Sequence, residues 1–278
     1  MWTPEDRALV GDFGSGQALS DDQYRLIEPF IPPPKLGGRP RTTDMRLMLD
    51  GLFYVVRTGS QWRHLPPAFP PWQTVYGYFR TFLTTGVWET IRHHLVMTLR
   101  ESEGREASPT AAIIDTQSVK TTEKRGPCGY DAAKKVKGRK RHVAVDTLGL
   151  LLGVIVHAAD IQDADRAWDL LKKVKQLYCW LKVVFADSIY NRVTVLLACF
   201  LLGLTLIIVR RMAGTTGFVV IPRRWIVERT LGWLGRWRRL SKDYEELPEV
   251  SQAMVTLAMI RLMLHRLVHP NRKRLPVS

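Results

Sequence analysis

Three acidic residues stand where their burial would be unfavourable without a partner. Asp115 interrupts the apolar run AAII-D, and Asp187 closes the apolar run VVFA-D. A buried carboxylate is costly unless it is paired, hydrogen-bonded or bound to a metal ion. Two such carboxylates on strands that are neighbours in a sheet therefore favour a metal site. Asp also begins turns, and that role explains each residue equally well when it is taken singly.

The third acidic residue, Glu228, lies in the helical pattern WIVERTLGWLGRWRRL, residues 225–240. At 100° per residue, one stripe of this helix is suited to core packing and contains Ile226, Thr230, Trp233, Trp237 and Leu240. The opposite face holds Glu228 with Arg224, Gly232, Gly235 and Arg239. That face suits a phosphate held close to the backbone through a metal ion. A solvated face with an Arg224–Glu228 ion pair is an equally good explanation.

Asp115, Asp187 and Glu228 together supply three hard oxygen ligands from two strands and a helix, a set that binds Mg²⁺ or Mn²⁺. Two such ions, roughly 3.5–4 Å apart, would activate the attacking oxygen and stabilise the leaving oxygen of an in-line phosphodiester displacement. No Ser, Cys or His nucleophile is then required. Capping or turn formation explains the other candidate carboxylates, which are Asp146, Asp160, Asp163 and Asp165.

The charge of the chain indicates a polyanionic partner. Its net charge is +15 and its pI is about 10.0,. Residues 120–142 hold nine Lys and Arg against two acidic residues, and residues 210–242 hold nine against one. Such runs are usually solvated faces, but two runs that flank a carboxylate cluster favour phosphate contacts. The candidate DNA contacts are Lys120, Lys134, Lys135, Lys137, Arg139, Lys140, Arg141, Arg224, Arg236 and Arg239.

The first hundred residues read as helices separated by turns rich in Pro and Gly. Ser20 and Gln23 form a possible capping box for a helix over residues 21–30. Thr43 or Asp44 can cap a second helix, which ends at Gly59, and helical patterns follow at 75–83 and 87–99. In the GGRPR motif, Arg39 and Arg41 could enter a minor groove, although a flexible linker explains that short motif better.

The charged segment 101–110 reads as a linker, and strand-like patterns begin after it. The segments that start at residues 111, 141 and 151 are strands, and the last two should be antiparallel neighbours. A helix over 164–177 and a buried strand that ends at Asp187 follow. This order predicts an α/β fold with a mixed sheet. The uncharged segment 193–209 is long enough to raise the alternative of a membrane span, but Gly203 and its β-branched second half favour helix, turn and buried strand.

Composition excludes several classes of protein. A chain of 278 residues is too long for a peptide hormone, and 46% hydrophobic residues argue against a disordered basic tail,. The cysteines are Cys128, Cys179 and Cys199, an odd number without a CxxC pair, so neither a disulfide framework nor a zinc finger is expected. The first residues have no apolar stretch typical of a secretory signal, which predicts a cytoplasmic protein.

Five segments resemble one known family, the bacterial insertion-sequence transposases with a DDE triad, of the insertion-sequence-five group. Residues 19–66 resemble its helical DNA-binding region. IIDTQSVK, GYDAAKKVKGRKRHVAVDTLGLLL and HAADIQDAD resemble the first half of its catalytic domain, and GFVVIPRRWIVERTLGWLGRWRRLSKDYE resembles its C-terminal signature. The resemblance covers nearly the whole chain.

The resemblance implies a helical DNA-binding domain over residues 1–104 and a ribonuclease-H-like catalytic domain over 105–278. It carries the family's triad onto Asp115, Asp187 and Glu228, which the residue chemistry had already selected. It implies Mg²⁺- or Mn²⁺-dependent cleavage, with two ions, at the inverted-repeat ends of an insertion sequence, followed by attack of the freed 3′-OH on target DNA. The expected partner is double-stranded DNA, bound by a homodimer or higher oligomer at the bacterial nucleoid, without a membrane.

The sequence also departs from the family pattern. Ser188 and Ile189 replace the usual Gly-Gly after the second Asp, and Ile221 and Gly235 replace the Tyr and Lys of a Tyr-Arg-Glu-Lys signature. Arg236 or Arg239 could substitute for that lysine. The alternative function is therefore an inactive copy that binds DNA by sequence. A third reading, a structure-selective nuclease, does not need the helical N-terminal unit.

Overall fold

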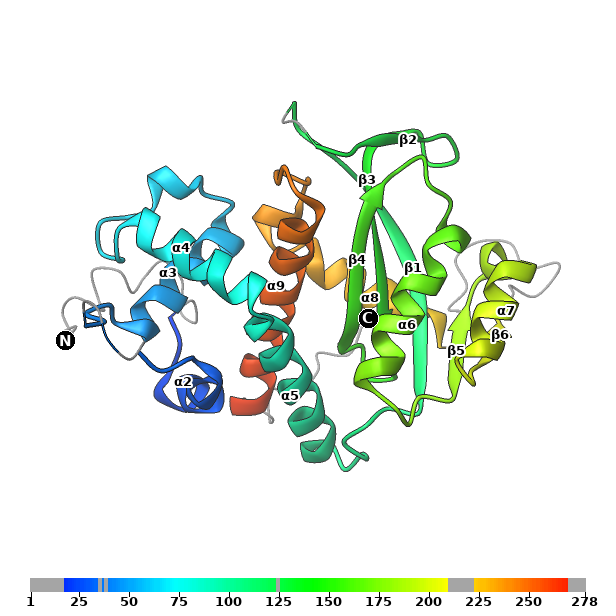
Figure 1. Ribbon diagram of the computed structural model, residues 1–278, viewed down its shortest axis with the longest axis horizontal. Helices are drawn as coiled ribbons and strands as arrows, with labels where there is room; N and C mark the ends of the chain where they lie inside the picture. Colours follow the sequence, from blue (N-terminus) through cyan, green and yellow to red (C-terminus); the bar gives the residue numbers. More distant parts are fainter. Residues whose placement is uncertain (1–17, 35–36, 38–39, 124–125, 210–222, 270–278) are drawn as a thin grey trace, which may run out of the picture.

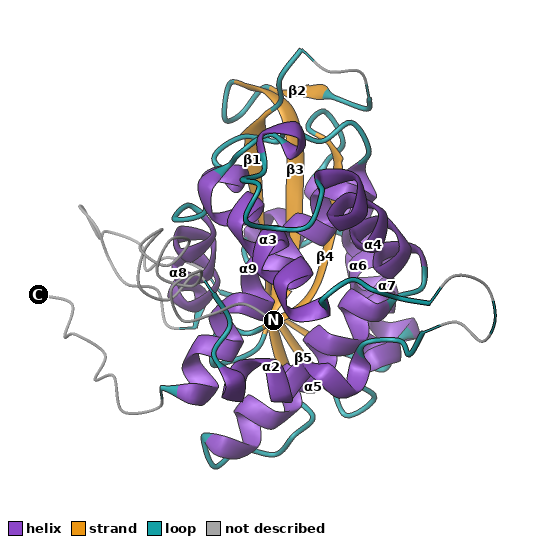
Figure 2. Ribbon diagram, turned by 90° about the vertical axis from the view of Figure 1, so that its left-hand side faces the viewer, coloured by secondary structure: helices purple, strands orange, loops and turns teal. Residues whose placement is uncertain are grey.

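The computed structural model of the protein describes residues 18–34, 37, 40–123, 126–209 and 223–269. Helices from the N-terminal third lie on one side of the molecule and a mixed sheet lies on the other (Figure 1). The last helix in the sequence runs between these two parts. Seen from the side of the helical part, the short N-terminal helices lie in front of the sheet (Figure 2).

The helical part contains the predicted helices, although the first gives way to a 3-10 turn after Ile27 and two later helices are up to three residues longer at one end than predicted. Helix α2 (Asp21–Ile27) starts at a capping box in which Ser20 and Gln23 exchange hydrogen bonds. Helix α3 (Met45–Thr58) is capped by Asp44, whose side chain accepts a hydrogen bond from the Leu47 N–H at 3.0 Å. It ends at Gly59, which has a left-handed φ of 72°,. Helices α4 (Trp72–Thr84) and α5 (Val87–Ser102) match the two predicted patterns that follow.

Within the described residues the sheet has six strands, of which β3 (Val136–Val145) lies between β1 (Ala111–Lys120) and β4 (Leu151–Ala158). These three strands are antiparallel, as predicted for the pair after residue 141. On its other edge β1 pairs in parallel with β5 (Val183–Ala186), and β5 pairs in parallel with β6 (Thr205–Ile208). The short strand β2 (Gly129–Asp131) pairs with the start of β3. The mixed sheet with flanking helices, preceded by a helical N-terminal part, confirms the predicted α/β fold class.

Helices cover both faces of this sheet. Helix α8 (Arg224–Leu234) packs on β1 and β3, whereas α6 (Ala167–Leu177) packs on β3 and β4 from the opposite face, as the two views show (Figures 1 and 2). Successive side chains of a strand point to opposite faces. Each residue of β1 therefore faces either α8 or α6, and this alternation determines the surroundings of every polar residue on the strand.

The apolar segment 193–209 forms helix α7 (Val193–Leu201), a turn and strand β6, in the predicted order. Within the described residues, no helix is both long and apolar enough to cross a membrane. The prediction of a buried strand here is wrong in one respect. Because β6 is the outer strand of the sheet, its residues are alternately exposed and half-buried. The outer side of α7 is also apolar and exposed, with Phe200 79% exposed.

The predicted helix over residues 225–240 is shorter in the structure. Helix α8 ends at Leu234, its C-cap is Gly235, and a separate 3-10 turn, η5 (Arg238–Leu240), follows. Two glycines within four residues weaken the helix at this point. Trp237 and Leu240 are buried as expected, but they are not in line with the apolar stripe of α8. Arg239 likewise does not share a helical face with Glu228.

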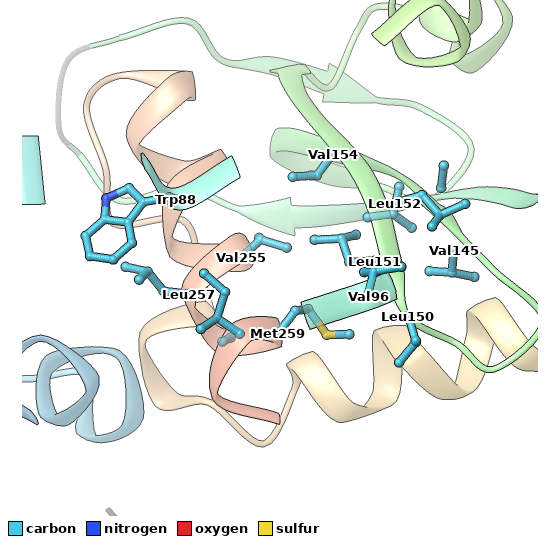
Figure 3. Packing of buried hydrophobic residues seen from close by; sticks show 14 of the residues in the cluster. Trp88, Val96, Val145, Leu150, Leu151, Leu152, Val154, Val255, Leu257 and Met259 are labelled. Carbon is cyan, nitrogen blue, oxygen red and sulfur yellow. The ribbon is translucent and has the colours of Figure 1, made fainter. Parts of the chain in front are cut away.

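One hydrophobic core joins the helical part to the sheet. Helix α9 (Pro248–Val268) contacts α5 and β4 most extensively and also touches α2 and α3. Thirteen of its 21 residues are buried. Figure 3 shows Val255, Leu257 and Met259 of α9 between Trp88 of α5 and the strand residue Leu151. Each fully buried aliphatic side chain stabilises the fold by roughly 1.5–3 kcal/mol, so α9 holds the two parts firmly together.

Candidate functional site

Asp115 and Asp187 are brought side by side by the pairing of two parallel strands. The register of β1 and β5 aligns Ala111 with Val183 and Ile113 with Phe185. Extended by two residues, the same register brings Asp115 level with Asp187, which directly follows β5. Residues aligned in this way lie on the same face of a sheet, with strands about 4.8 Å apart. The two carboxylates that the sequence singled out are therefore neighbours.

Each of these carboxylates has one oxygen fixed by a backbone N–H. The Asp115 Oδ1 atom accepts a hydrogen bond from the Thr116 N–H at 2.8 Å. The Asp187 Oδ1 atom accepts one from the Ile189 N–H at 3.0 Å, which makes Asp187 the N-cap of the short 3-10 helix η4 (Ser188–Tyr190). These contacts hold the two side chains in place through their Oδ1 oxygens. Ser188 and Ile189, the departures from the family pattern, are exposed.

Burial is the main reason that the carboxyl of Asp115 has an unusual pKa. Burial, with a smaller contribution from the neighbouring Asp187, raises the pKa from an ordinary value of 3.8 to about 6. The Thr116 N–H, Arg224 and Lys134 lower it only in part. A cation placed beside the carboxylates would stabilise their charged forms.

Glu228 is joined to this pair through Arg224. The Arg224 Nη2 atom lies 3.6 Å from Asp187 Oδ2, and its Nε atom lies 3.3 Å from Glu228 Oε1. The predicted i,i+4 pair is thus present, but the guanidinium also reaches the second Asp. Helix α8 is placed by Ile226, Val227 and Thr230, which are buried against the sheet.

Arg223, at the start of α8, supports this position. Its guanidinium carbon lies 4.3 Å from the centroid of the Phe185 ring on β5, a cation–π contact,. The backbone of Arg223 has a φ of 67°, which is uncommon for a residue with a side chain,. Among the residues described here, no three His, Cys, Asp or Glu side chains are close enough together to hold a metal ion by themselves. The structure therefore unites Asp115 with Asp187 and attaches Glu228 through a guanidinium.

On the α6 side of β1 lies a buried polar network that sequence reasoning did not find. The Thr116 hydroxyl donates to Asp163 Oδ2 at 2.5 Å, and Lys140 Nζ lies 2.8 Å from Asp163 Oδ1. Tyr190 Oη and His142 Nε2 are 2.8 Å apart, a further hydrogen bond within the same layer. Asp163, a fallback ligand in the sequence, is thus fully occupied. The one available signal was the place of Thr116 and Tyr190 close after the two aspartates.

Asp146, another fallback carboxylate, also has a structural role. It forms a buried ion pair with Arg100 and accepts hydrogen bonds from the N–H groups of Leu148 and Leu150. Asp160 and Asp165 are exposed.

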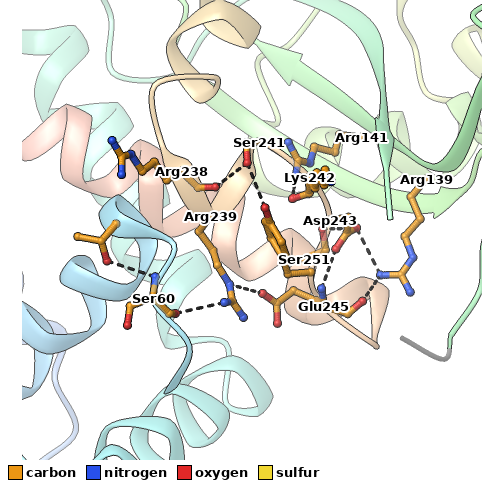
Figure 4. Close-up of polar contacts among 12 residues, drawn as sticks. Ser60, Arg139, Arg141, Arg238, Arg239, Ser241, Lys242, Asp243, Glu245 and Ser251 are labelled. Carbon is orange, nitrogen blue, oxygen red and sulfur yellow. Dashed lines mark hydrogen bonds and ion pairs between the residues drawn. The ribbon is translucent and has the colours of Figure 1, made fainter. Parts of the chain in front are cut away.

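The predicted basic residues divide into an exposed and a buried group. Lys120, Lys134, Lys135, Lys137 and Arg236 are exposed, and Arg224 is half-buried. The buried side chains are Arg139, Lys140, Arg141 and Arg239. Arg139 donates to the Glu245 carbonyl, and Arg141 donates to the carbonyls of Leu240 in η5 and of Lys242 after it. Arg239 pairs with Glu245 and reaches the Ser60 carbonyl (Figure 4). As placed, these four present no charge to a polyanion.

The two arginines of the GGRPR motif, Arg39 and Arg41, were the predicted minor-groove contacts. Arg41 donates a hydrogen bond to the Pro32 carbonyl at 2.7 Å. Arg39 lies outside the described residues, as does Ile221 of the signature. Of the two proposed substitutes for the signature lysine, Arg236 is exposed and Arg239 is buried.

Two family models match the chain. One, "Putative transposase of IS4/5 family", matches residues 19–92, and the other, "Transposase DDE domain", matches residues 106–263. An insertion element IS402 uncharacterized 16.2 kDa protein of Burkholderia cepacia is 30% identical over 37% of this chain and 72% of its own length. A putative transposase for insertion sequence element IS402, also of Burkholderia cepacia, is 28% identical over 48% of this chain and 65% of its own length.

A comparison with solved structures finds the crystal structure of the Mos1 mariner paired end complex with Mn. It is 12% identical, covers 94% of this chain and 89% of that chain, and has a TM-score of 0.31.

Proposed function

Because the chain belongs to the DDE transposase family, we propose that it cuts DNA at the inverted-repeat ends of an insertion sequence and joins the freed 3′-OH strand to target DNA. The observation that carries this proposal is the alignment of Asp115 with Asp187 across two parallel strands, with one oxygen of each carboxylate already fixed by a backbone N–H. That geometry offers carboxylate oxygens from two neighbouring strands to a cation.

We assign Asp115, Asp187 and Glu228 as ligands of Mg²⁺ or Mn²⁺. The donor set fits, because divalent cations of this kind take carboxylate oxygens. Burial beside Asp187 raises the pKa of Asp115, and a bound cation would favour its ionised form,. When bound, two ions supply Lewis acidity to the attacking and leaving oxygens of a phosphodiester. The role of the protein is to hold the carboxylates ionised and correctly spaced on a rigid sheet.

Arg224 must leave its present position before Glu228 can act with the two aspartates. Its guanidinium contacts both Asp187 and Glu228, so it occupies the space between them. A DNA phosphate is a natural alternative partner for a guanidinium, since it accepts two parallel hydrogen bonds. We propose that DNA draws Arg224 away and leaves the three carboxylates to the ions.

The exposed basic residues Lys120, Lys134, Lys135, Lys137 and Arg236 are the proposed phosphate contacts around the site,. The helical part, residues 1–104 in the proposed division, would recognise the terminal repeats, and residues 105–278 would cut them. A homodimer or higher oligomer on DNA would bring two ends together. An inactive DNA-binding copy is the second candidate, favoured by the guanidinium between the carboxylates.

The test is cleavage of DNA that carries the element's own terminal repeats, with Mg²⁺ or Mn²⁺. Asp115→Asn, Asp187→Asn and Glu228→Gln should each reduce cutting by at least a thousandfold, a loss on the scale of other essential groups. The matched control is Asp169→Asn, an exposed Asp on α6 paired with Arg166, which should leave cutting unchanged. Specific binding without any cutting by the wild-type protein would establish the second candidate instead.

A further inference from the structure

Tyr190 is a buried side chain directly behind the two aspartates. It is the last residue of η4, the short helix that Asp187 caps, and only 1% of it is exposed. Its ring lies 5.5 Å from that of His142, and its hydroxyl is hydrogen-bonded to His142 Nε2 at 2.8 Å. The loop that carries Asp187 is therefore attached to the interior of the sheet by one side chain.

His142 belongs to the strand that holds Asp115 in place. It lies on β3 directly opposite Thr116, the residue that follows Asp115 on β1. Val143, the next residue of β3, lies opposite Asp115 itself. Because Tyr190 ends the short helix that Asp187 caps, and His142 lies beside Asp115 in the sheet, a shift of Tyr190 away from His142 would change the distance between Asp187 and Asp115.

The surroundings make this attachment stiff. His142 is fully buried, and burial lowers its pKa to about 3, so the ring is neutral and its hydrogen bond with Tyr190 is unchanged over the working pH range. Burial, together with the nearby carboxylates of Asp163, Asp115 and Asp187, raises the pKa of Tyr190 well above its ordinary value, so the phenol keeps its proton. Thr116, opposite His142 on β1, is bound by Asp163, which Lys140 holds. Buried networks of this kind are rigid because each member restricts the next.

From this geometry we infer that Tyr190 is a positioning residue, which sets the spacing of Asp115 and Asp187 through its hydrogen bond to His142. The inference rests on the proposed function, because spacing matters only if the two carboxylates share ligands. Groups behind metal ligands typically contribute 10–100-fold to metal affinity. Tyr190 is neither a ligand nor in contact with substrate, so its loss should affect metal binding and leave DNA binding intact.

The experiment compares Tyr190→Phe with the wild-type full chain. Mn²⁺ binding to the protein alone, followed by electron paramagnetic resonance, should weaken about tenfold or more. The Mn²⁺ concentration that half-saturates cutting should rise by a similar factor. DNA affinity measured with a chelator present should not change. A variant that loses only stability would not show this separation of metal binding from DNA binding.

Tyr178→Phe is the matched control. Tyr178 is also 1% exposed, but it lies between α6 and β5 against the ring of His93, 4.9 Å away. Removal of its hydroxyl should leave the Mn²⁺ affinity unchanged. An equal loss of Mn²⁺ affinity in both variants would mean that any softening of the core has this effect, and it would overturn the inference.

A second variant tests the bond from its other end. His142→Leu removes the same hydrogen bond, so it should weaken Mn²⁺ binding as Tyr190→Phe does. The double variant should bind Mn²⁺ no more weakly than whichever single variant has the lower Mn²⁺ affinity. Additive losses would overturn the inference, as would unchanged Mn²⁺ binding in Tyr190→Phe. If Asp115→Asn leaves Mn²⁺ binding unchanged, the proposed function itself fails, and that outcome is separate from the behaviour of Tyr190.

Discussion

Two acidic residues, one against each face of strand β1, have pKa values that are shifted in opposite directions. On the α6 face, Asp163 is bound by Lys140 and Thr116; burial alone would raise its pKa, but these partners bring the pKa below its ordinary value. On the α8 face, burial raises the pKa of Asp115 to about 6, and Arg224 and Lys134 compensate only partly. The first face has its cation built into the fold. On the second face the cations of the protein oppose the shift of Asp115 only in part.

Asp163 and Asp115 are therefore expected to differ in what they contribute to the stability of the fold. A buried carboxylate with a complete set of partners holds the fold together, whereas one with an incomplete set is destabilising and is retained for its chemistry. Substitutions on the two faces should therefore have opposite effects on the free energy of unfolding.

The largest expected effect is on the α6 face, where Lys140 and Thr116 bind Asp163. Lys140→Met removes the cation that contacts Asp163 and approaches Asp131, and leaves two carboxylates without it in the interior. We expect a loss of about 3–5 kcal/mol in the free energy of unfolding, measured with urea at pH 8. Lys172→Met, at an exposed position of α6, is the control and should change stability little. A small loss for Lys140→Met would mean that the network is not a structural element.

On the α8 face, Asp115→Asn is expected to have a smaller effect of opposite sign on the free energy of unfolding. The raised pKa of Asp115 means that the folded protein binds its proton more tightly than the unfolded chain does. Stability of the wild type therefore falls as the pH rises from about 4 to about 6, and the penalty persists above that pH. Without divalent metal, Asp115→Asn should be about 2–3 kcal/mol more stable than wild type at pH 8, with no difference below pH 4.

Urea unfolding at both pH values measures this difference, and Asp169→Asn serves as the exposed control. A variant that is less stable than wild type at pH 8 would show that Asp115 already has the partners it needs, and the contrast between the faces would disappear.

The smallest effect concerns Arg224, whose charge lowers the raised pKa of Asp115 in part. Its side chain is about one-third exposed, so its ion pairs with Asp187 and Glu228 are worth at most about 1 kcal/mol,. Arg224→Gln should tighten Mn²⁺ binding in the absence of DNA by about two- to fivefold, because the cation no longer competes with a guanidinium. Arg236→Gln, at an exposed position, should not. Weaker Mn²⁺ binding in Arg224→Gln would show that the guanidinium supports the site.

Much of the fold followed from local patterns. The Ser20–Gln23 capping box, the Asp44 cap and Gly59 marked helix ends because capping depends on neighbouring residues alone. Asp115 and Asp187 were candidates because each interrupts or ends an apolar run, but turn formation explained each equally well until the strand register brought them level.

Other features depend on which residues meet in space, which a sequence without relatives does not reveal. Arg139, Lys140 and Arg141 read as an exposed basic run, yet the middle of β3 is buried on both faces and each charge finds a partner far along the chain. The hydrogen bond from Tyr190 to His142 spans 48 residues and has no periodicity to indicate it. The end of α8 at Leu234 depended on two glycines whose effect competed with a regular apolar stripe.

The central place of α9 has a consequence for synthesis. Because residues 248–268 fill the space between α5 and β4, a nascent chain still attached to the ribosome before that point cannot complete its core,. Premature termination upstream of α9 would leave an apolar, protease-sensitive fragment. Only chains translated through this helix would acquire a folded DNA-cutting site, which ties the onset of a hazardous activity to faithful completion of the polypeptide.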